Sequence, residues 1–330
     1  MATEQAKHMA ELFASVSERT SKPGLDLATI RDISERLHLC GTEPEGVTYA
    51  EVDADGVHAL WCVPEGSDTD HVLMHCHNGG GVLFSIYTDR KAAGHLARAT
   101  GVRVLVVDFG LAPEHPFPAQ IDDVERVYQW LLAQGYRPEN IVSSGHSIGG
   151  NFAVSLVVRL RDKGIALPGA ILSISPWSDI EMKSKTLDSN ASTDNLSRQQ
   201  LESFRELWLA GTGVTWDDPR INLLYADLTG LPPTMIQYGT GEILVGEIIE
   251  FVQRAKDAGV DISLHTVPEG QHSFIMGAGR VPEADEAIEQ MGRWVRTGLS
   301  LDDMRHSVPG AERSGGRIGQ RSQTRPDLRR

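Results

Sequence analysis

The sequence has few cysteines and no long apolar run. Its three cysteines, Cys40, Cys62 and Cys76, have neither a disulfide-like pairing pattern nor the spacing of a metal site, so we expect reduced thiols, a cytoplasmic location and no bound metal. Residues 1–20 carry charged side chains and lack an apolar core, which is not the pattern of a secretory signal peptide. No stretch is long and apolar enough to span a bilayer, which argues against a membrane protein.

Basic residues are also scarce. The chain has 31 Lys and Arg residues against 45 Asp and Glu residues, a formal net charge of −14. Such an excess of negative charge argues against nucleic acid or an anionic membrane surface as a partner. The end of the chain differs, since residues 309–330 hold six arginines and almost no apolar residue. We expect a disordered tail over residues 301–330.

Strand-like and helix-like segments alternate along most of the chain, which predicts a parallel sheet with helices on both faces. An Asp-Gly turn joins the first two strand-like runs into a hairpin. The expected strands are 47–52, 57–63, 71–76, 102–108, 140–145, 170–175, 234–238 and 261–267. The expected helices are 3–20, 26–38, 88–100, 121–134, 149–163, 196–210, 243–258 and 282–297.

Residues 180–225 interrupt the alternation with a polar segment of loops and helix. The expected organisation therefore has five parts. They are a helical arm (1–45), the first part of the core (46–179), an insertion (180–225), the second part of the core (226–300) and the tail (301–330).

Five residues, Gly145-His146-Ser147-Ile148-Gly149, lie between an apolar strand-like run and a helix-like run. A serine with glycines two residues before and after it, on a strand-to-helix turn, is the nucleophile-elbow pattern of serine hydrolases. The turn lifts the hydroxyl clear of the sheet, and side chains at the two glycine positions would collide with the neighbouring strand or helix. The pattern predicts Ser147 as a nucleophile, which needs an adjacent base because a serine hydroxyl reacts poorly at neutral pH.

Two further motifs precede the elbow. They are His77-Asn78-Gly79-Gly80-Gly81 and Asp108-Phe109-Gly110-Leu111-Ala112-Pro113-Glu114-His115-Pro116-Phe117-Pro118. With the elbow, these motifs resemble bacterial esterases of the hormone-sensitive lipase family of α/β-hydrolases. The likeness covers residues 45–297 and passes through Ser175-Pro176-Trp177-Ser178-Asp179 to His272. The Asn-Gly-Gly and Gly-His-Ser-Ile-Gly-Gly variants are more weakly similar to monoterpene epsilon-lactone hydrolases within this group.

The resemblance implies an α/β-hydrolase fold, with a mostly parallel eight-stranded sheet and a helical cap in which the arm and the insertion pack together. It places the base at His272, after the last strand, and the acid at Glu242, just past the seventh strand. Glu247 and Asp257 are rival acids on the following helix, where a solvated face is the simpler interpretation. The expected oxyanion-hole donors are the backbone N–H groups of Gly79, Gly80 and Ile148.

The expected activity is hydrolysis of a carboxylic ester through an acyl-enzyme on Ser147, without a cofactor. The expected substrate is a small molecule with an acyl chain of about four to eight carbons. A hydrophobic lactone is the alternative substrate, and a catalytically silent ligand-binding protein is the second alternative. A homodimer is left open. The residues expected to bind substrate are Asn78, Gly81, Val82, Leu83, Phe84, Trp177, Phe204, Trp208, Ile243 and Leu244.

Five residues around these motifs need their own interpretation. Gly81 stands where the resembling family usually has a bulky residue, so we expect it to widen the pocket floor. Asn78 replaces the first motif glycine of that family, which leaves the backbone conformation there open. His75 and His77 point the same way on a strand, but no third ligand accompanies them, so we expect no metal site. We expect His77 to anchor the oxyanion loop by hydrogen bonding, and we assign His146 no catalytic role.

Overall fold

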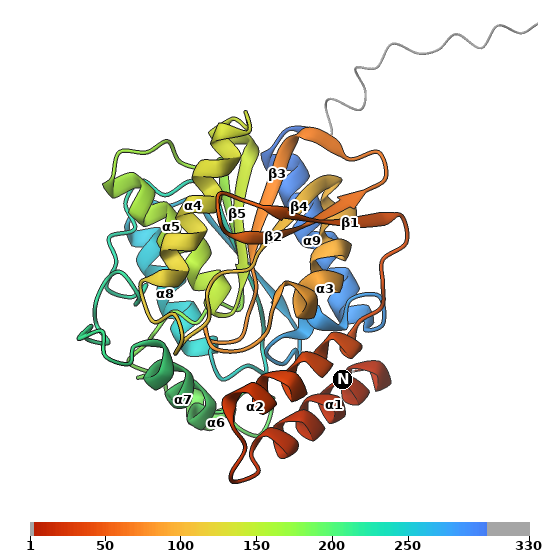
Figure 1. Ribbon diagram of the computed structural model, residues 1–330, viewed down its shortest axis with the longest axis vertical. Helices are drawn as coiled ribbons and strands as arrows, with labels where there is room; N and C mark the ends of the chain where they lie inside the picture. The colour runs from red at the N-terminus through yellow and green to blue at the C-terminus, as the bar shows by residue number, and fades with distance from the viewer. Residues whose placement is uncertain (1–2, 302–330) are drawn as a thin grey trace, which may run out of the picture.

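The computed structural model describes residues 3–301 and places an eight-stranded sheet at its centre (Figure 1). The strand order is β1-β2-β4-β3-β5-β6-β7-β8. β1 pairs antiparallel with β2 and β2 with β4, whereas the other neighbours pair parallel, so the expected mostly parallel sheet is confirmed. The strands are β1 (Val47–Asp53), β2 (His58–Pro64), β3 (Asp68–Cys76), β4 (Val102–Val107), β5 (Ile141–His146), β6 (Ala170–Ile174), β7 (Thr234–Gly239) and β8 (Ile262–Val267).

Helices cover both faces of this sheet (Figure 1). α4, α5 and α8 pack on one face, and α3 and α9 pack on the other. The α-helices are α1 (Glu4–Thr20), α2 (Leu27–Ser34), α3 (Ile86–Thr100), α4 (Ala119–Ala133), α5 (Ile148–Asp162), α6 (Thr186–Ser189), α7 (Arg198–Trp208), α8 (Val245–Asp257) and α9 (Pro282–Gly298). Short 3₁₀ turns are η1 (Glu35–Cys40), η2 (Pro138–Asn140) and η3 (Phe274–Gly277).

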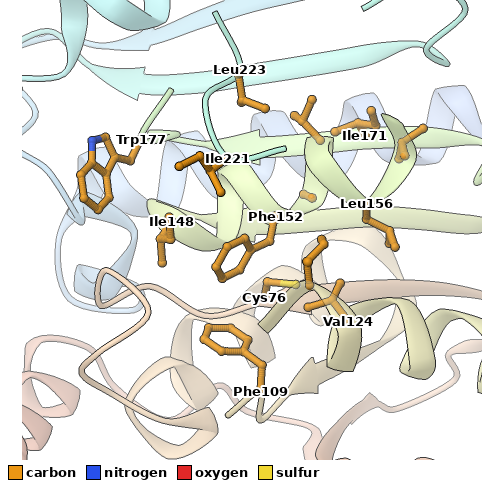
Figure 2. Close-up of a cluster of buried hydrophobic side chains, with 14 of the residues drawn as sticks. Cys76, Phe109, Val124, Ile148, Phe152, Leu156, Ile171, Trp177, Ile221 and Leu223 are labelled. Atoms are coloured by element: carbon orange, nitrogen blue, oxygen red, sulfur yellow. The ribbon is translucent and has the colours of Figure 1, made fainter. Parts of the chain in front are cut away.

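A hydrophobic core lies on each face of the sheet, and successive side chains along a strand point alternately into one core and the other. In β3, Val72, Met74 and Cys76 belong to the core beneath α4, α5 and α8, while Leu73 belongs to the core beneath α3 and α9. Figure 2 shows part of the first core, where Phe152 of α5 lies near Cys76. Because the central strands are buried on both faces, β4 and β6 are nearly continuous apolar runs, whereas β5 also buries the small polar residues Ser143 and Ser144.

The predicted helix over residues 26–38 differs from the structure. α2 ends at Ser34, whose hydroxyl donates back to the Ile30 carbonyl at 2.7 Å, and the chain continues as η1. The Glu35 carboxylate accepts hydrogen bonds from the hydroxyls of Ser85 and Thr88 at the start of α3. The contacts with α3 therefore fix the shape of this turn, and helical periodicity alone does not report them.

The helical arm packs on the core, and it also meets the insertion at one end of the molecule. Arg31 of α2 donates to the Val82 carbonyl at 2.8 Å and forms an ion pair with Glu114 at 2.7 Å. The apolar stripe of α1 buries against η3 and the start of α9. This cluster contains Met9, Phe13, Val16, Met276, Val281 and Ala284. The arm and the insertion meet around the cavity described below, at the end of the molecule where α1, α2, α6 and α7 lie (Figure 1).

Three global features bear on function. Within residues 3–301, no helix combines the length and the apolar character needed to cross a membrane. The three cysteines are buried and unpaired. In the same described range, no group of three or more His, Cys, Asp or Glu side chains could hold a metal ion. The tail expected over residues 301–330 lies outside the described residues from position 302 onward.

Candidate active site

The Ser147 turn is enforced by close backbone contacts. Ser147 joins β5 to α5 with φ of 60° and ψ of −120°, a conformation that side chains rarely adopt. A Cβ atom on Gly145 would lie 2.0 Å from the Gly149 carbonyl oxygen. A Cβ atom on Gly149 would lie 2.1 Å from the Cys76 carbonyl oxygen. Both glycines are therefore required by the approach of helix to strand, and the turn exposes the serine hydroxyl at the carboxyl edge of the sheet.

The structure brings Ser147, His272 and Glu242 together from three separate loops. His272 Nε2 lies 2.9 Å from Ser147 Oγ, and His272 Nδ1 lies 3.1 Å from Glu242 Oε2. The serine follows β5, the glutamate follows β7 and the histidine follows β8. Parallel strands end at one edge of a sheet, which is where such folds bind their ligands. The three side chains form a continuous hydrogen-bonded chain, all less than one-tenth exposed.

The environment of His272 favours its charged form. Burial alone disfavours an imidazolium, but the hydrogen bond and charge of Glu242 and the charge of Asp194 more than offset it. The pKa of His272 therefore lies above its ordinary value of 6.5. The Glu242 carboxylate is held by two donors on its other oxygen, the Ser175 hydroxyl at 2.6 Å and the Gly239 N–H at 2.5 Å. This arrangement stabilises an imidazolium that forms during proton transfer.

The glycine-rich loop after β3 lies beside Ser147. Gly79, Gly80 and Gly81 all have positive φ, whereas Asn78 is not among the positive-φ residues, so asparagine needs no unusual backbone conformation there. In residues 3–301, the N–H groups of Gly79, Gly80 and Ile148 have no protein acceptor. Gly79 and Gly80 line the cavity next to Ser147, and Ile148 begins α5 directly after it. These free donors are placed to bind an anionic oxygen.

A cavity of about 80 Å³ opens at the Ser147 hydroxyl. Five of the residues predicted to bind substrate line it, namely Asn78, Leu83, Phe84, Trp177 and Phe204. Phe204 of α7 lies directly over the glycine loop, because a Cβ atom on Gly80 would come within 2.4 Å of its ring. The phenyl ring therefore takes up space that would otherwise extend the cavity.

The other five predicted pocket residues are not among those that line this cavity. Trp208, Ile243 and Leu244 are fully buried in the core. Val82 is also a core residue, and its carbonyl accepts from Arg31. A Cβ atom on Gly81 would meet the Trp208 ring at 3.4 Å, an ordinary contact, so this position borders the buried tryptophan rather than the cavity, and its φ of 73° is what favours glycine. Their apolar character could not distinguish core from cavity.

The sequence argument missed the wall contributed by the arm. From α1 and η1, the cavity is lined by Phe13, Val16, Ser17, Thr20 and Leu37. From the segment before α7 and its first turn, it is lined by Asn195, Leu196, Gln200 and Leu201. The amphipathic pattern of α1 signalled a buried stripe but not what it would cover. Asp194 was also missed, although its carboxylate accepts from the backbone N–H of His272 at 2.7 Å.

The three other histidines singled out from the sequence, His75, His77 and His146, are buried in the fold. The His77 ring stacks on Phe109 with centroids 4.1 Å apart, and its Nδ1 lies 2.8 Å from the Asn78 carbonyl oxygen, so it contacts the oxyanion loop as expected. His75 contacts the hydroxyl of Ser144 at 3.1 Å. His146 is completely buried, and burial lowers its pKa to about 3, so it is neutral at physiological pH.

The rival acids lie apart from this set. Asp257 is exposed near the end of α8, as expected of a solvated face. Glu247 is buried instead, which corrects the expectation of a solvated position. Its carboxylate accepts from the backbone N–H groups of Ser178 at 2.7 Å and Asp179 at 3.1 Å, and burial raises its pKa well above the ordinary 4.5. Glu247 therefore stabilises the loop that follows β6.

Comparison with known proteins agrees with this geometry. A family model described as the alpha/beta hydrolase fold matches residues 73–276. The chain is 35% identical over 267 residues to an esterase from Acinetobacter venetianus, covering 80% of this chain and 87% of that protein. It is 34% identical to an acetyl-hydrolase from Streptomyces hygroscopicus, covering 72% of this chain and 79% of that protein.

Solved structures give the same picture. An esterase from the bacterial hormone-sensitive lipase family matches with a TM-score of 0.85 and 33% identity, covering 91% of this chain and 99% of that chain. The structure of EstE5 soaked with p-nitrophenyl butyrate matches with a TM-score of 0.82 and 28% identity, covering 91% of this chain and 100% of that chain. The fold and the site thus define an α/β-hydrolase. The chain belongs to the bacterial hormone-sensitive lipase family within that superfamily, as the resemblance implied.

Proposed function

We propose that this protein is a serine carboxylic-ester hydrolase in which Ser147 carries the acyl group. The observation that carries the proposal is the hydrogen-bonded chain from Ser147 through His272 to Glu242, which ends at a cavity beside free backbone donors. The names of the relatives, esterase and acetyl-hydrolase, support the reaction class. A catalytically silent protein would have no need of this arrangement.

The reaction proceeds in two halves. His272 Nε2 accepts the Ser147 proton as Oγ attacks the ester carbonyl, and the imidazolium is stabilised by Glu242. The tetrahedral oxyanion accepts hydrogen bonds from the N–H groups of Gly79, Gly80 and Ile148, each contributing about 3 kcal/mol to the lower barrier. His272 then donates its proton to the leaving alcohol. Water then enters and loses a proton to His272 as its oxygen attacks the acyl carbonyl. His272 returns that proton to Ser147 Oγ as the acyl C–O bond breaks, which releases the acid and regenerates free Ser147.

The cavity favours short acyl groups. Its volume of about 80 Å³ is smaller than the few hundred Å³ typical of ligand pockets. We therefore propose acetyl to butyryl esters as substrates, a shorter range than the sequence suggested. A relative named acetyl-hydrolase and a relative soaked with p-nitrophenyl butyrate support this range, whereas a bulky lactone would require a larger cavity.

Two further proposals concern location and assembly. The three buried, unpaired cysteines favour a reducing compartment such as the cytoplasm. Cell fractionation with an antibody to the native chain tests this. The homodimer left open by the sequence stays a prediction, and sedimentation equilibrium of the purified protein would test it.

The substrate proposal is tested with p-nitrophenyl esters of increasing acyl length and one bulky lactone. We expect kcat/KM to be highest from acetate to butyrate and to fall for longer chains and for the lactone. Ser147→Ala should lower turnover about 10⁶-fold, as loss of the triad serine does in subtilisin. Ser203→Ala, an exposed serine on α7, is the matched control and should behave as wild type. A Ser147→Ala enzyme that kept a tenth of wild-type turnover would rule out the nucleophile.

A further inference from the structure

One carboxylate of the insertion bonds to both loops that carry the acid and the base. Asp194 Oδ1 accepts from the backbone N–H of His272 at 2.7 Å, and Asp194 Oδ2 accepts from the backbone N–H of Ile243 at 2.8 Å. Ile243 directly follows Glu242, so the two oxygens hold the residue next to the acid and the base itself. Asp194 lies just before α7 and belongs to neither loop.

Neighbouring residues of the insertion reinforce this attachment. The Asn190 side chain donates to the Glu242 carbonyl at 2.9 Å, and the Thr193 hydroxyl donates to the Gly241 carbonyl at 2.8 Å. The Asn195 side chain donates to the His272 carbonyl at 2.5 Å. Residues 190–195 therefore supply partners to both loops. Thr193 also contacts both, since its carbonyl accepts from the Gln271 side chain at 3.1 Å, but within this segment Asp194 is the residue whose side chain accepts from backbone N–H groups of both loops.

The charge of Asp194 also acts on His272. Burial raises the pKa of Asp194 to about 6, against the lowering effect of His272, and the charge of Glu242 adds to the increase. In return, both carboxylates raise the pKa of His272. His146 also faces the His272 ring, with centroids 5.5 Å apart, but it is neutral and contributes no charge. The imidazolium that forms during turnover therefore has two anionic neighbours.

We propose that Asp194, a residue of the insertion, is a positioning residue for the triad. Its carboxylate holds the backbone of His272 and of the residue after Glu242 in place, and its negative charge stabilises the imidazolium. The proposal rests on the function assigned above, in which His272 is the base. It follows that the acid and the base are fully aligned only when the insertion is in place. The insertion then both walls the cavity and completes the catalytic geometry.

The direct test is an NMR titration of ¹⁵N-histidine-labelled full-length protein, with the His272 signal assigned by its loss in His272→Ala. In Asp194→Asn, we expect the His272 midpoint to fall by about half a pH unit or more, because an anionic neighbour is lost. We expect kcat to fall roughly 10- to 100-fold through misalignment, with KM within about threefold of wild type. The acid limb of the kcat profile should move to lower pH by the same amount as the midpoint.

The matched control is Asp188→Asn, which removes an exposed carboxylate of the same insertion that pairs with Arg198 at 2.9 Å. It should change neither the His272 midpoint nor kcat. A folded Asp194→Asn protein with an unchanged His272 midpoint, or with wild-type kcat, would overturn the proposal. The titration needs no turnover, so a wild-type protein without esterase activity would refute the proposed function alone.

If Asp194→Asn does not fold, Asp194→Ala with added formate gives an independent answer. Formate can occupy the space left by the carboxylate and accept from the same two N–H groups. We expect formate to raise kcat at least about tenfold over chloride at equal ionic strength, given the misalignment cost above. No recovery in a folded Asp194→Ala protein would reject a role for this carboxylate.

Discussion

At the scale of the residue, Glu242 shows how a longer side chain takes the position usually held by aspartate. One carboxylate oxygen accepts from Ser175 and Gly239, which leaves the other oxygen for His272. The side chain is fully buried, so water cannot replace these bonds. The extra methylene therefore costs no alignment, because three fixed donors determine where the carboxylate lies.

Replacing Glu242 with glutamine should lower kcat roughly 10⁴-fold. The amide cannot stabilise the imidazolium and can hold His272 in the wrong tautomer, as the equivalent change does in a Ser-His-Asp enzyme. The measurement is kcat for p-nitrophenyl acetate with the melting temperature recorded in parallel, since Glu242 is buried.

Glu247→Gln and Asp257→Asn serve as controls for Glu242. Burial raises the pKa of Glu247 well above 4.5, and glutamine has nearly the same shape and keeps a carbonyl oxygen that can accept from Ser178 and Asp179. Asp257 is exposed. Both variants should retain nearly full activity. A large loss at Glu247 with none at Glu242 would transfer the acid role to α8.

Residue-level prediction worked where a backbone requirement appears as a fixed spacing. The glycines around Ser147 are such a case, since helix and strand approach too closely there for any Cβ atom. The role of Asp194 and the burial of Glu247 were not predicted, because their partners are backbone N–H groups of loops far along the chain. Such contacts leave no pattern in the sequence, and an isolated acidic residue in a polar segment looks like any other surface residue.

At the scale of the element, α7 contributes part of the cavity wall. Phe204 lines the cavity and touches Gly80, while Leu207, one turn further along, packs on the core without lining it. The sequence predicted a helix here and named both Phe204 and Trp208 as pocket residues. Phe204 lines the cavity and Trp208 does not, because the orientation of α7 against the core determines which of its faces borders the cavity.

Phe204→Ala should extend the acyl range. Removing the ring adds room for a longer chain, and each additional buried methylene contributes about 0.8 kcal/mol, or roughly fourfold in kcat/KM. The ratio of kcat/KM for octanoate over acetate should therefore rise at least about tenfold. Leu207→Ala is the control and should leave that ratio unchanged. An unaltered ratio in Phe204→Ala would show that this ring does not limit acyl length.

At the scale of the whole molecule, the sheet and its covering helices were predictable because each strand and helix carries its own apolar pattern. The mostly parallel sheet and its two helical layers followed from the α/β alternation and the resemblance, whereas the order of the strands was not predicted. The packing of the arm did not follow, because an amphipathic helix reveals only that one face is buried. In the structure, the stripe of α1 packs on η3 and the start of α9, and Phe13 and Val16 of that stripe also line the cavity.

Deletion of residues 1–38 should lower stability and blunt acyl selectivity together. Met9, Phe13 and Val16 are each less than one-tenth exposed, and burial of such side chains contributes about 1.5–3 kcal/mol each. A loss of that size lowers the melting temperature of a chain this long by roughly 10 °C or more. The deletion also removes Phe13, Val16 and Thr20 from the cavity wall, so longer acyl chains should gain relative to acetate. Differential scanning calorimetry and the p-nitrophenyl ester series measure the two effects.

Two point variants separate the wall from the stripe. Phe13→Ala should reproduce part of both effects, since this side chain belongs to the α1 cluster and also lines the cavity. Glu11→Ala, an exposed change on the same helix, should reproduce neither. An arm-deleted enzyme with an unchanged melting temperature and an unchanged chain-length profile would show that the arm neither stabilises the core nor walls the site. Because one helix serves both purposes, stability and selectivity should change together in α1 variants, whereas Phe204→Ala should alter selectivity with a smaller cost in stability.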